Sequence, residues 1–262
     1  MIKVMKFNFS KRYGQNFLTD KNLLSAIVAD SKAGADDTVV EVGAGAGALT
    51  VELAKAVKRV ISYEIDTRLK DILSAGLAQS SNVEIVFEDI LKAKVWENLD
   101  GYRVVANLPY YITTPILFYF LECSNPPKSM TVMVQEEVAR RMTAEPGTPD
   151  YGALSVSIAL RGTAVITRKV GRNMFVPPPN VDSAVVRIEL DKARDTDYTD
   201  VTKVIRAAFG MRRKTLVNCL MTLGINKDTA LGAVRACGLD DAVRGERLGR
   251  DDFVRLTKAI YS

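Results

Sequence analysis

The chain has 262 residues, of which 47% are hydrophobic, so it can bury the core of one large domain and a small one. It contains no histidine, which excludes Ser-His-Asp catalysis, Cys-His dyads and histidine metal sites. Its three cysteines lack Cys-x-x-Cys spacing, so we expect neither a disulfide framework nor a bound metal. The net charge of +5 is compatible with a polyanionic partner.

The first twelve residues alternate charged with single apolar residues and have no signal-peptide core. No apolar run approaches the length of a membrane span. We therefore expect a cytoplasmic protein with no membrane partner, and nothing in the sequence indicates more than a monomer.

Short apolar runs alternate with stretches of helical spacing through the first 144 residues. A helix is predicted over residues 20–30, with Thr19 as its N-cap. Further helices are predicted at 49–58, 67–78, 114–123 and 136–144, between strands at 38–42, 59–65, 83–87, 103–106 and 130–134. This alternation predicts an α/β fold with a mostly parallel sheet and helices on both faces.

The pattern changes after residue 144. Strands are predicted at 153–161 and 184–190, and because Pro177-Pro178-Pro179 and no helix lie between them, we expect an antiparallel edge. The polar stretch 191–200 indicates a domain boundary. Helical periodicity returns beyond it and predicts a small all-helical domain, with helices at 201–209, 216–223, 227–237 and 250–261.

A glycine-rich turn, Glu41-Val42-Gly43-Ala44-Gly45-Ala46-Gly47-Ala48, follows the first predicted strand of the sheet. Glycines there allow a ligand to approach the backbone and the first amides of the next helix. Gly43, Gly45 and Ala48, with the acid Glu64 about 20 residues further on, also satisfy the dinucleotide-binding pattern. A nicotinamide oxidoreductase is therefore a serious alternative at this point.

Two further features favour S-adenosylmethionine as the cofactor. An acid, Glu41, precedes the first glycine, and the third strand ends in Glu88-Asp89-Ile90. Asp89 could accept a hydrogen bond from an adenine amine while Glu64 binds the ribose hydroxyls.

The fourth strand leads into Asn107-Leu108-Pro109-Tyr110, hereafter the tetrapeptide 107–110. The Asn107 carboxamide oxygen and the carbonyl of Leu108 or Pro109 can accept the two hydrogens of a nucleobase amine and direct its lone pair toward an electrophile. Tyr110 can stack on a base that has left its helix. Beside a cofactor turn, this combination predicts methyl transfer to a planar nitrogen, and a dehydrogenase would gain nothing from it.

Five segments in order resemble the rRNA adenine dimethyltransferases of the KsgA type: 13–18, 41–50, 107–110, 175–183 and 209–216. The resemblance runs from residue 11 to the C-terminus. It implies a class I methyltransferase domain over 1–193, Rossmann-like with a mostly parallel seven-stranded sheet and an N-terminal basic arm. It also implies a helical rRNA-binding domain over 194–262.

The activity implied by this resemblance uses S-adenosylmethionine to dimethylate two adjacent adenosines in the 3'-terminal hairpin loop of 16S rRNA. The partner would be the pre-30S particle, and the role would be in small-subunit biogenesis. The erythromycin-resistance methylases, which act on large-subunit rRNA, share the tetrapeptide, but segments 181–185 and 212–216 favour the small-subunit branch. An assembly factor without turnover is the third class of function.

The resemblance also implies roles for individual residues. The expected cofactor contacts are Asn16, Leu18, Gly43, Gly45, Gly47, Glu64, Asp89, Ile90 and Asn107. The expected catalytic residues are Asn107, Leu108, Pro109 and Tyr110, with Phe175 closing the second face of the adenine. The residues expected to contact RNA phosphates are Lys11, Arg12, Arg212, Arg213 and Lys214.

Overall fold

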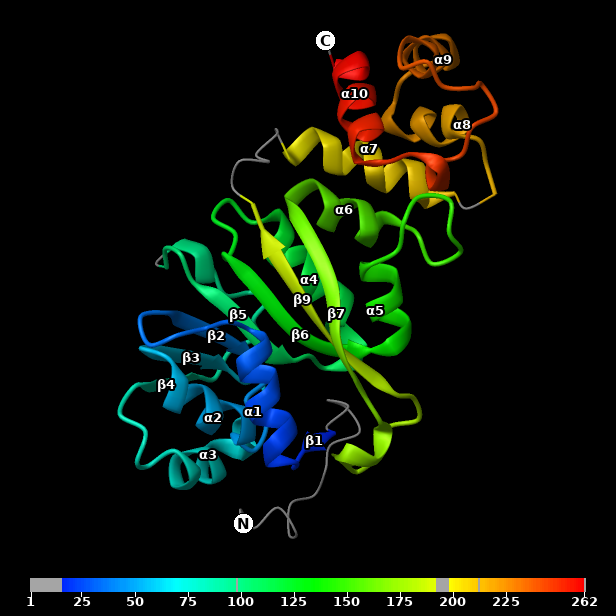
Figure 1. Cartoon of the computed structure of the whole chain (residues 1–262). Coiled ribbons are helices and arrows are strands. Elements are labelled where there is room, and N and C mark those ends of the chain that lie inside the picture. Colours follow the sequence, from blue (N-terminus) through cyan, green and yellow to red (C-terminus); the bar gives the residue numbers. More distant parts are fainter. Residues whose placement is uncertain (1–15, 98, 192–197, 212, 262) are drawn as a thin grey trace. The chain divides into compact units, whose positions relative to one another are not determined.

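The computed structural model describes residues 16–97, 99–191, 198–211 and 213–261. The chain divides into two compact units (Figure 1). The first comprises Met1–Ala139 and Ala164–Leu190, and the second comprises Arg140–Thr163 and Asp191–Ser262. This division differs from a single boundary at residue 193, because the segment 140–163 packs with the C-terminal helices.

A seven-stranded sheet forms the centre of the first unit. In sheet order its strands are β4 (Val83–Val86), β3 (Arg59–Tyr63), β2 (Thr38–Val42), β5 (Arg103–Asn107), β6 (Ser129–Gln135), β9 (Ser183–Leu190) and β7 (Gly162–Val170). The strands from β4 to β6 are parallel, and β9 runs antiparallel to β6. The predicted fold class, a mostly parallel seven-stranded sheet with helices, is therefore confirmed.

Helices cover the sheet because each carries one apolar face. The helices of this unit are α1 (Lys21–Asp30), α2 (Ala48–Ala56), α3 (Lys70–Gly76), α4 (Thr113–Glu122) and the start of α5 (Glu136–Met142). Ile27 of α1 and Leu53 of α2 are fully buried, in the same core cluster as the β2 residue Val39. Asp20, rather than Thr19, caps α1, since its carboxylate accepts a hydrogen bond from the Leu23 amide at 2.9 Å.

A second, two-stranded sheet joins β1 (Phe17–Leu18) to β8 (Phe175–Val176). The strands are antiparallel, with Phe17 opposite Val176 and Leu18 opposite Phe175. The peptide bond between Val176 and Pro177 is cis. This small sheet joins residues 17–18 to the segment between β7 and β9, the last two strands of the first unit along the chain apart from β8 itself.

The second unit is helical in the part of it that the structure describes. Its helices are α6 (Ala153–Arg161), α7 (Tyr198–Gly210), α8 (Leu216–Leu220), α9 (Lys227–Ala236) and α10 (Arg250–Tyr261). Leu160, Val204 and Phe253 are fully buried in its core. The prediction of a strand over 153–161 is wrong, because this segment is the helix α6, which is buried on nearly every side. The strand in this part of the sequence is β7, which follows α6 directly.

None of the helices within the described ranges is both long enough and apolar enough to cross a membrane.

Candidate active site

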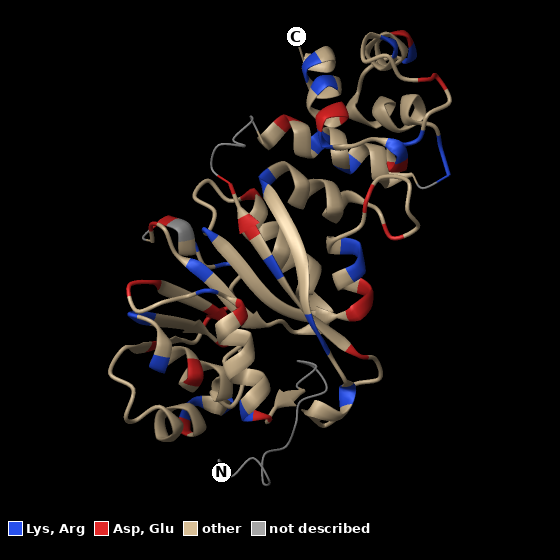
Figure 2. Ribbon diagram, viewed as in Figure 1, with Lys and Arg blue, Asp and Glu red and all other residues tan. Residues whose placement is uncertain are grey.

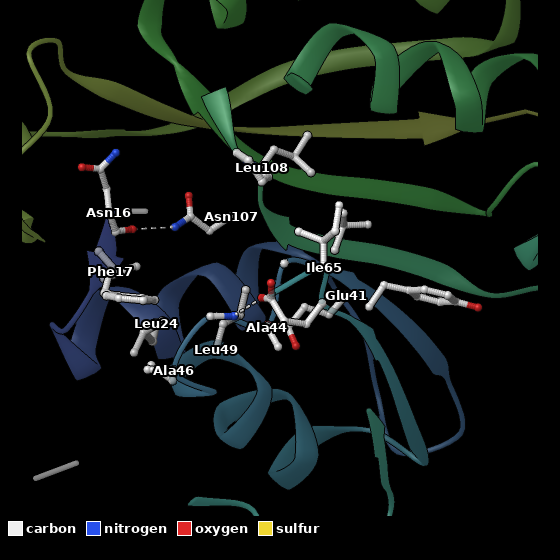
Figure 3. Close-up of a pocket in the computed structure, with 18 of the residues that line it drawn as sticks. Asn16, Phe17, Leu24, Glu41, Ala44, Ala46, Leu49, Ile65, Asn107 and Leu108 are labelled. Atoms are coloured by element: carbon white, nitrogen blue, oxygen red, sulfur yellow. Dashed lines mark hydrogen bonds between the residues drawn. The ribbon is translucent and has the colours of Figure 1, made fainter. Parts of the chain in front are cut away.

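The carboxyl ends of β2, β3, β4 and β5 surround a cavity of about 480 Å³ (Figure 3). In the sheet, β3 and β4 lie on one side of β2 and β5 lies on the other, so the strand order reverses between β2 and β5. Parallel α/β sheets bind ligands at such a reversal. The cavity volume falls within the range of roughly 300–1,000 Å³ that is typical of small-molecule sites. Most of the expected contacts line it: Asn16, Leu18, Gly43, Gly45, Glu64, Asp89, Ile90, Asn107, Leu108, Pro109 and Tyr110.

The glycine-rich turn adopts a backbone that other residues rarely adopt. Gly43, Gly45 and Gly47 have φ angles of 81°, 55° and 82°, all in the left-handed region. A Cβ on Gly45 would lie 2.9 Å from the Phe17 ring. Gly47 is the N-cap residue of α2 and does not line the cavity, so its contribution is to the shape of the turn.

Glu64 holds the glycine-rich turn against the end of β3. Its side chain is 6% exposed, with one carboxylate oxygen 2.9 Å from the Gly45 amide and the other 2.8 Å from the Asp66 amide. Burial raises the pKa of this carboxyl above its usual value, and the two amide donors oppose that change. A carboxylate has about four lone-pair positions, so Glu64 can still accept hydrogen bonds from a ligand in the cavity.

A second buried carboxyl, Glu41, lies near the end of β2 and also lines the cavity. It is 1% exposed and accepts hydrogen bonds from Thr50 Oγ1 and Ser62 Oγ, each at 2.6 Å. Burial raises the pKa of Glu41 to about 7. Glu41 thus links β2 to α2 and β3 through these hydrogen bonds.

Among the described residues, no group of three or more His, Cys, Asp or Glu is arranged to hold a metal ion.

Asn107 ends β5 with its side chain at the cavity wall. Its Nδ2 donates to the backbone carbonyl of Asn16 at 3.5 Å (Figure 3), a long hydrogen bond that directs the amide group. With Nδ2 engaged in this way, Oδ1 is the atom that can accept hydrogens from a ligand.

The carbonyl of Pro109 is already used within the chain. It accepts hydrogen bonds from the Ile112 amide at 3.1 Å and from Thr113 Oγ1 at 3.0 Å, at the turn η5 (Tyr110–Ile112) that leads into α4. The sequence left Leu108 and Pro109 as alternative carbonyl acceptors for the target amine. The structure favours Leu108.

Tyr110 and Phe175 occupy different environments. Tyr110 lines the cavity, and its hydroxyl lies 2.6 Å from Ser183 Oγ, the first residue of β9. Burial raises the pKa of Tyr110, so the hydroxyl stays protonated at neutral pH. Phe175 is 2% exposed, packs in the same core cluster as Leu18 of β1, and does not line the cavity. The interpretation of Phe175 as a stacking residue therefore has no support in the structure.

The residues expected to contact RNA are described only in part. Arg213 and Lys214 are exposed on the connection between α7 and α8, where Figure 2 shows basic residues. Lys11, Arg12 and Arg212 lie outside the described residues.

Asp89 lies at the cavity rim, where its Oδ1 accepts a hydrogen bond from the Leu91 amide at 3.1 Å.

A mostly parallel seven-stranded sheet with a glycine-rich turn after β2 and the tetrapeptide 107–110 after β5 defines a class I methyltransferase. Two solved structures share the fold over nearly the whole chain. A dimethyladenosine transferase from Plasmodium falciparum is 27% identical with a TM-score of 0.79, covering 92% of this chain and 95% of that one. The 23S rRNA methyltransferase ErmE is 27% identical with a TM-score of 0.71, covering 94% and 100%.

The chain belongs to the ribosomal RNA adenine dimethylase family, which matches residues 6–261. It is 44% identical over 260 residues to the ribosomal RNA small subunit methyltransferase A of Caldanaerobacter subterraneus subsp. tengcongensis, covering 96% of this chain and 97% of the relative. The protein of the same name from Clostridioides difficile is 43% identical over 270 residues, covering 99% and 93%. The resemblance inferred from the sequence is thus confirmed.

Proposed function

We propose that this protein uses S-adenosylmethionine to dimethylate the exocyclic amines of two adjacent adenosines in the 3'-terminal hairpin loop of 16S rRNA. One observation carries the proposal: the tetrapeptide 107–110 forms part of the wall of the same cavity as the glycine-rich turn and Glu64. The names of the curated relatives support the small subunit as the source of the substrate.

The cavity wall offers a binding group for each part of the cofactor. Glu64 would accept the ribose hydroxyls, and Asp89 would accept the adenine amine. The backbone at Gly43 and Gly45 would lie against the methionine part, since no side chain intervenes there. When bound, the cofactor supplies a methyl group on a positively charged sulfur.

The target adenine would be held by the chain's own acceptors. Asn107 Oδ1 and the Leu108 carbonyl would accept the two amine hydrogens, while the Tyr110 ring stacks on the base. Leaving the RNA stack costs a few kcal/mol, and base–aromatic stacking of about 1–3 kcal/mol offsets part of that cost. The amine becomes acidic as the methyl group transfers and can lose its proton to water, so a chain without histidine suffices.

The substrate would be rRNA within the pre-30S particle rather than isolated RNA. A small basic surface binds RNA through phosphates and shape, and Arg213 and Lys214 are exposed for such contacts. We place the protein in the cytoplasm, acting as a monomer in small-subunit biogenesis.

Incubation with labelled S-adenosylmethionine and unmethylated 30S subunits tests this proposal. Digestion of the rRNA should yield labelled N6,N6-dimethyladenosine from the 3'-terminal hairpin, and Asn107→Ala should serve as the inactive control. In a parallel incubation with 50S subunits, label found in that rRNA and absent from the 30S rRNA would transfer the assignment to the resistance-methylase branch. Particle binding without any label would indicate an assembly factor.

A further inference from the structure

Exposed apolar side chains gather on one segment beside the candidate active site. Met174, Val176 and Val181 are 37%, 47% and 43% exposed, and Pro177 and Pro178 between them are exposed as well. We call residues 174–181 the apolar loop. Soluble proteins bury such residues when they can, so an exposed cluster at a site indicates a surface that meets a partner.

Both ends of the apolar loop are attached to the cavity wall. Val176 pairs with Phe17, which lines the cavity. At the other end, Ser183 follows the loop by two residues and hydrogen-bonds Tyr110. The loop therefore leaves the wall beside β1 and returns to it at the tyrosine proposed to stack on the target base.

The loop is held in a fixed conformation, because its flanks bond to one another. The Arg172 guanidinium donates to the Asn180 carbonyl at 3.0 Å, and the Arg172 amide donates to an Asp182 carboxylate oxygen at 3.0 Å. The Asp182 carbonyl accepts a further hydrogen bond from the Glu136 amide at 3.0 Å. Three consecutive prolines restrict the intervening backbone. The loop backbone is therefore already ordered, and a binding partner that contacts its apolar side chains loses little further conformational entropy of the loop.

The charges beside the loop suit RNA. The Lys169 and Arg172 side chains are 82% and 58% exposed, and both precede the loop on the chain. Each also has an acidic partner, Glu136 at 3.7 Å and Asp182 at 3.4 Å, so the surface carries mixed charge with exposed cations. An apolar ridge flanked by cations matches bases flanked by phosphates.

We propose that the apolar loop is a wedge that packs against the bases next to the target adenosine and keeps that adenosine out of its stack. This inference rests on the proposed function. Proteins that distort nucleic acids insert apolar side chains of this kind, including Met and Pro, between neighbouring bases. Val176 and Val181 have stiff, branched side chains, which suits them to fill the space that a departing base leaves.

The test replaces Val176 and Val181 together by Ser. Single-turnover methyl transfer to unmethylated 30S subunits should slow by about tenfold or more, because restacking of the target then competes with its capture. Affinity for S-adenosylhomocysteine, affinity for the particle and the melting temperature should stay close to the wild-type values. Val176→Ile with Val181→Ile, which keeps apolar bulk, should restore the rate.

The matched control is Val165→Ser on β7, a valine that is 48% exposed and lies away from the cavity lining. Equal rates for this control and the Ser double variant would overturn the wedge, as would an Ile double variant as slow as the Ser one. A loss of cofactor affinity would give the loop a structural role, and a loss of particle affinity alone would make it a docking surface. A wild-type dimer that the Ser variant dissolves would identify a self-association surface.

Failure of the proposed function is a separate result. In that case the wild-type protein transfers no methyl group to the 30S subunit, and no variant is needed to see it.

Discussion

The hydroxyl of Tyr110 and Oγ of Ser183 lie 2.6 Å apart, which links the end of the tetrapeptide 107–110 to the start of the antiparallel strand β9. Ser183 is 1% exposed, so the contact is shielded from water. The Tyr110 ring is thereby oriented before any base arrives. Pre-orientation of this kind reduces the entropy lost when the substrate is bound.

Tyr110→Phe should separate the ring from its hydroxyl. The variant keeps stacking and loses one hydrogen bond of about 0.5–1.5 kcal/mol, so transfer should slow by no more than about tenfold. Tyr110→Ala should be at least about tenfold slower than Tyr110→Phe, because stacking is lost as well. Single-turnover kinetics on 30S subunits measures both. In a double-mutant cycle, Ser183→Ala should add little to Tyr110→Phe, and additive effects would show that the contact does not orient the ring.

Asn107→Ala should abolish transfer and leave particle binding largely intact, since it removes an acceptor for the amine and no surface charge. The expected loss in rate is about 10²-fold or more, as for a residue that positions the reacting group. Filter binding of 30S subunits provides the control for binding. Retention of more than about a tenth of the wild-type rate would remove Asn107 from the mechanism.

Glu64→Ala should weaken binding of S-adenosylhomocysteine by about tenfold to a hundredfold, the equivalent of a charge-assisted hydrogen bond of about 1.5–3 kcal/mol. Loss of the bond to the Gly45 amide should add to this effect, since that bond holds the glycine-rich turn. Calorimetry gives the affinity. The control is Glu88→Ala, an exposed acid on the same cavity wall, and equal effects of the two variants would argue against a special role for Glu64.

Glu41 should make folding stability depend on pH. Its pKa of about 7 in the folded state exceeds the ordinary value of 4.5, so the folded protein retains a proton that the unfolded chain releases. The resulting stabilisation is complete below pH 4.5 and is lost as the pH rises through about 7, an effect on the order of 3 kcal/mol. Denaturant titrations of wild type and Glu41→Gln at several pH values between 4.5 and 8 should show a steeper decline for wild type. The exposed Glu137→Gln variant should behave as wild type, and parallel curves for all three would contradict the assignment.

Replacing Arg213 and Lys214 by Ala should weaken 30S binding and flatten its dependence on salt, with cofactor affinity unchanged. Each lost phosphate contact should lower the log-log salt slope by about 0.7 to 0.9. Lys227→Ala with Arg235→Ala removes the same charge from α9 and serves as the control. If both double variants gave the same slope, the connection between α7 and α8 would not be a specific RNA contact.

The parallel half of the sheet could be predicted from the sequence because its strands are short apolar runs that a turn signal ends. The tetrapeptide 107–110, Glu64 and the glycine-rich turn could be assigned together for the same reason: parallel strands bring their carboxyl ends to one edge. The positions of these residues at the ends of predicted parallel strands were sufficient to group them, without knowledge of side-chain contacts.

The segment 153–161 shows where this reasoning fails. Its residues Ala-Leu-Ser-Val-Ser-Ile-Ala-Leu-Arg are apolar or small except for the last, and a buried helix of this length has the same pattern as a buried strand. The adjacent strand β7 was missed because its residues do not alternate between a buried and an exposed face. Val165 and Ile166 are neighbours and both exposed, and only Gly162 and Val170 of its nine residues are buried. The partners of Glu41 and the burial of Phe175 depend on contacts between distant segments, which spacing in the sequence does not reveal.

The pairing of β1 with β8 sets a condition on how the protein is made. Phe17 and Leu18 emerge from the ribosome early, but the strand that pairs with them begins only at Phe175. Closing such a long loop of chain is slow compared with forming local helices and strands. The cavity therefore acquires its complete wall only after most of the first unit has been synthesised, and a nascent chain that stops before Phe175 cannot yet hold the methyl donor as the finished protein does.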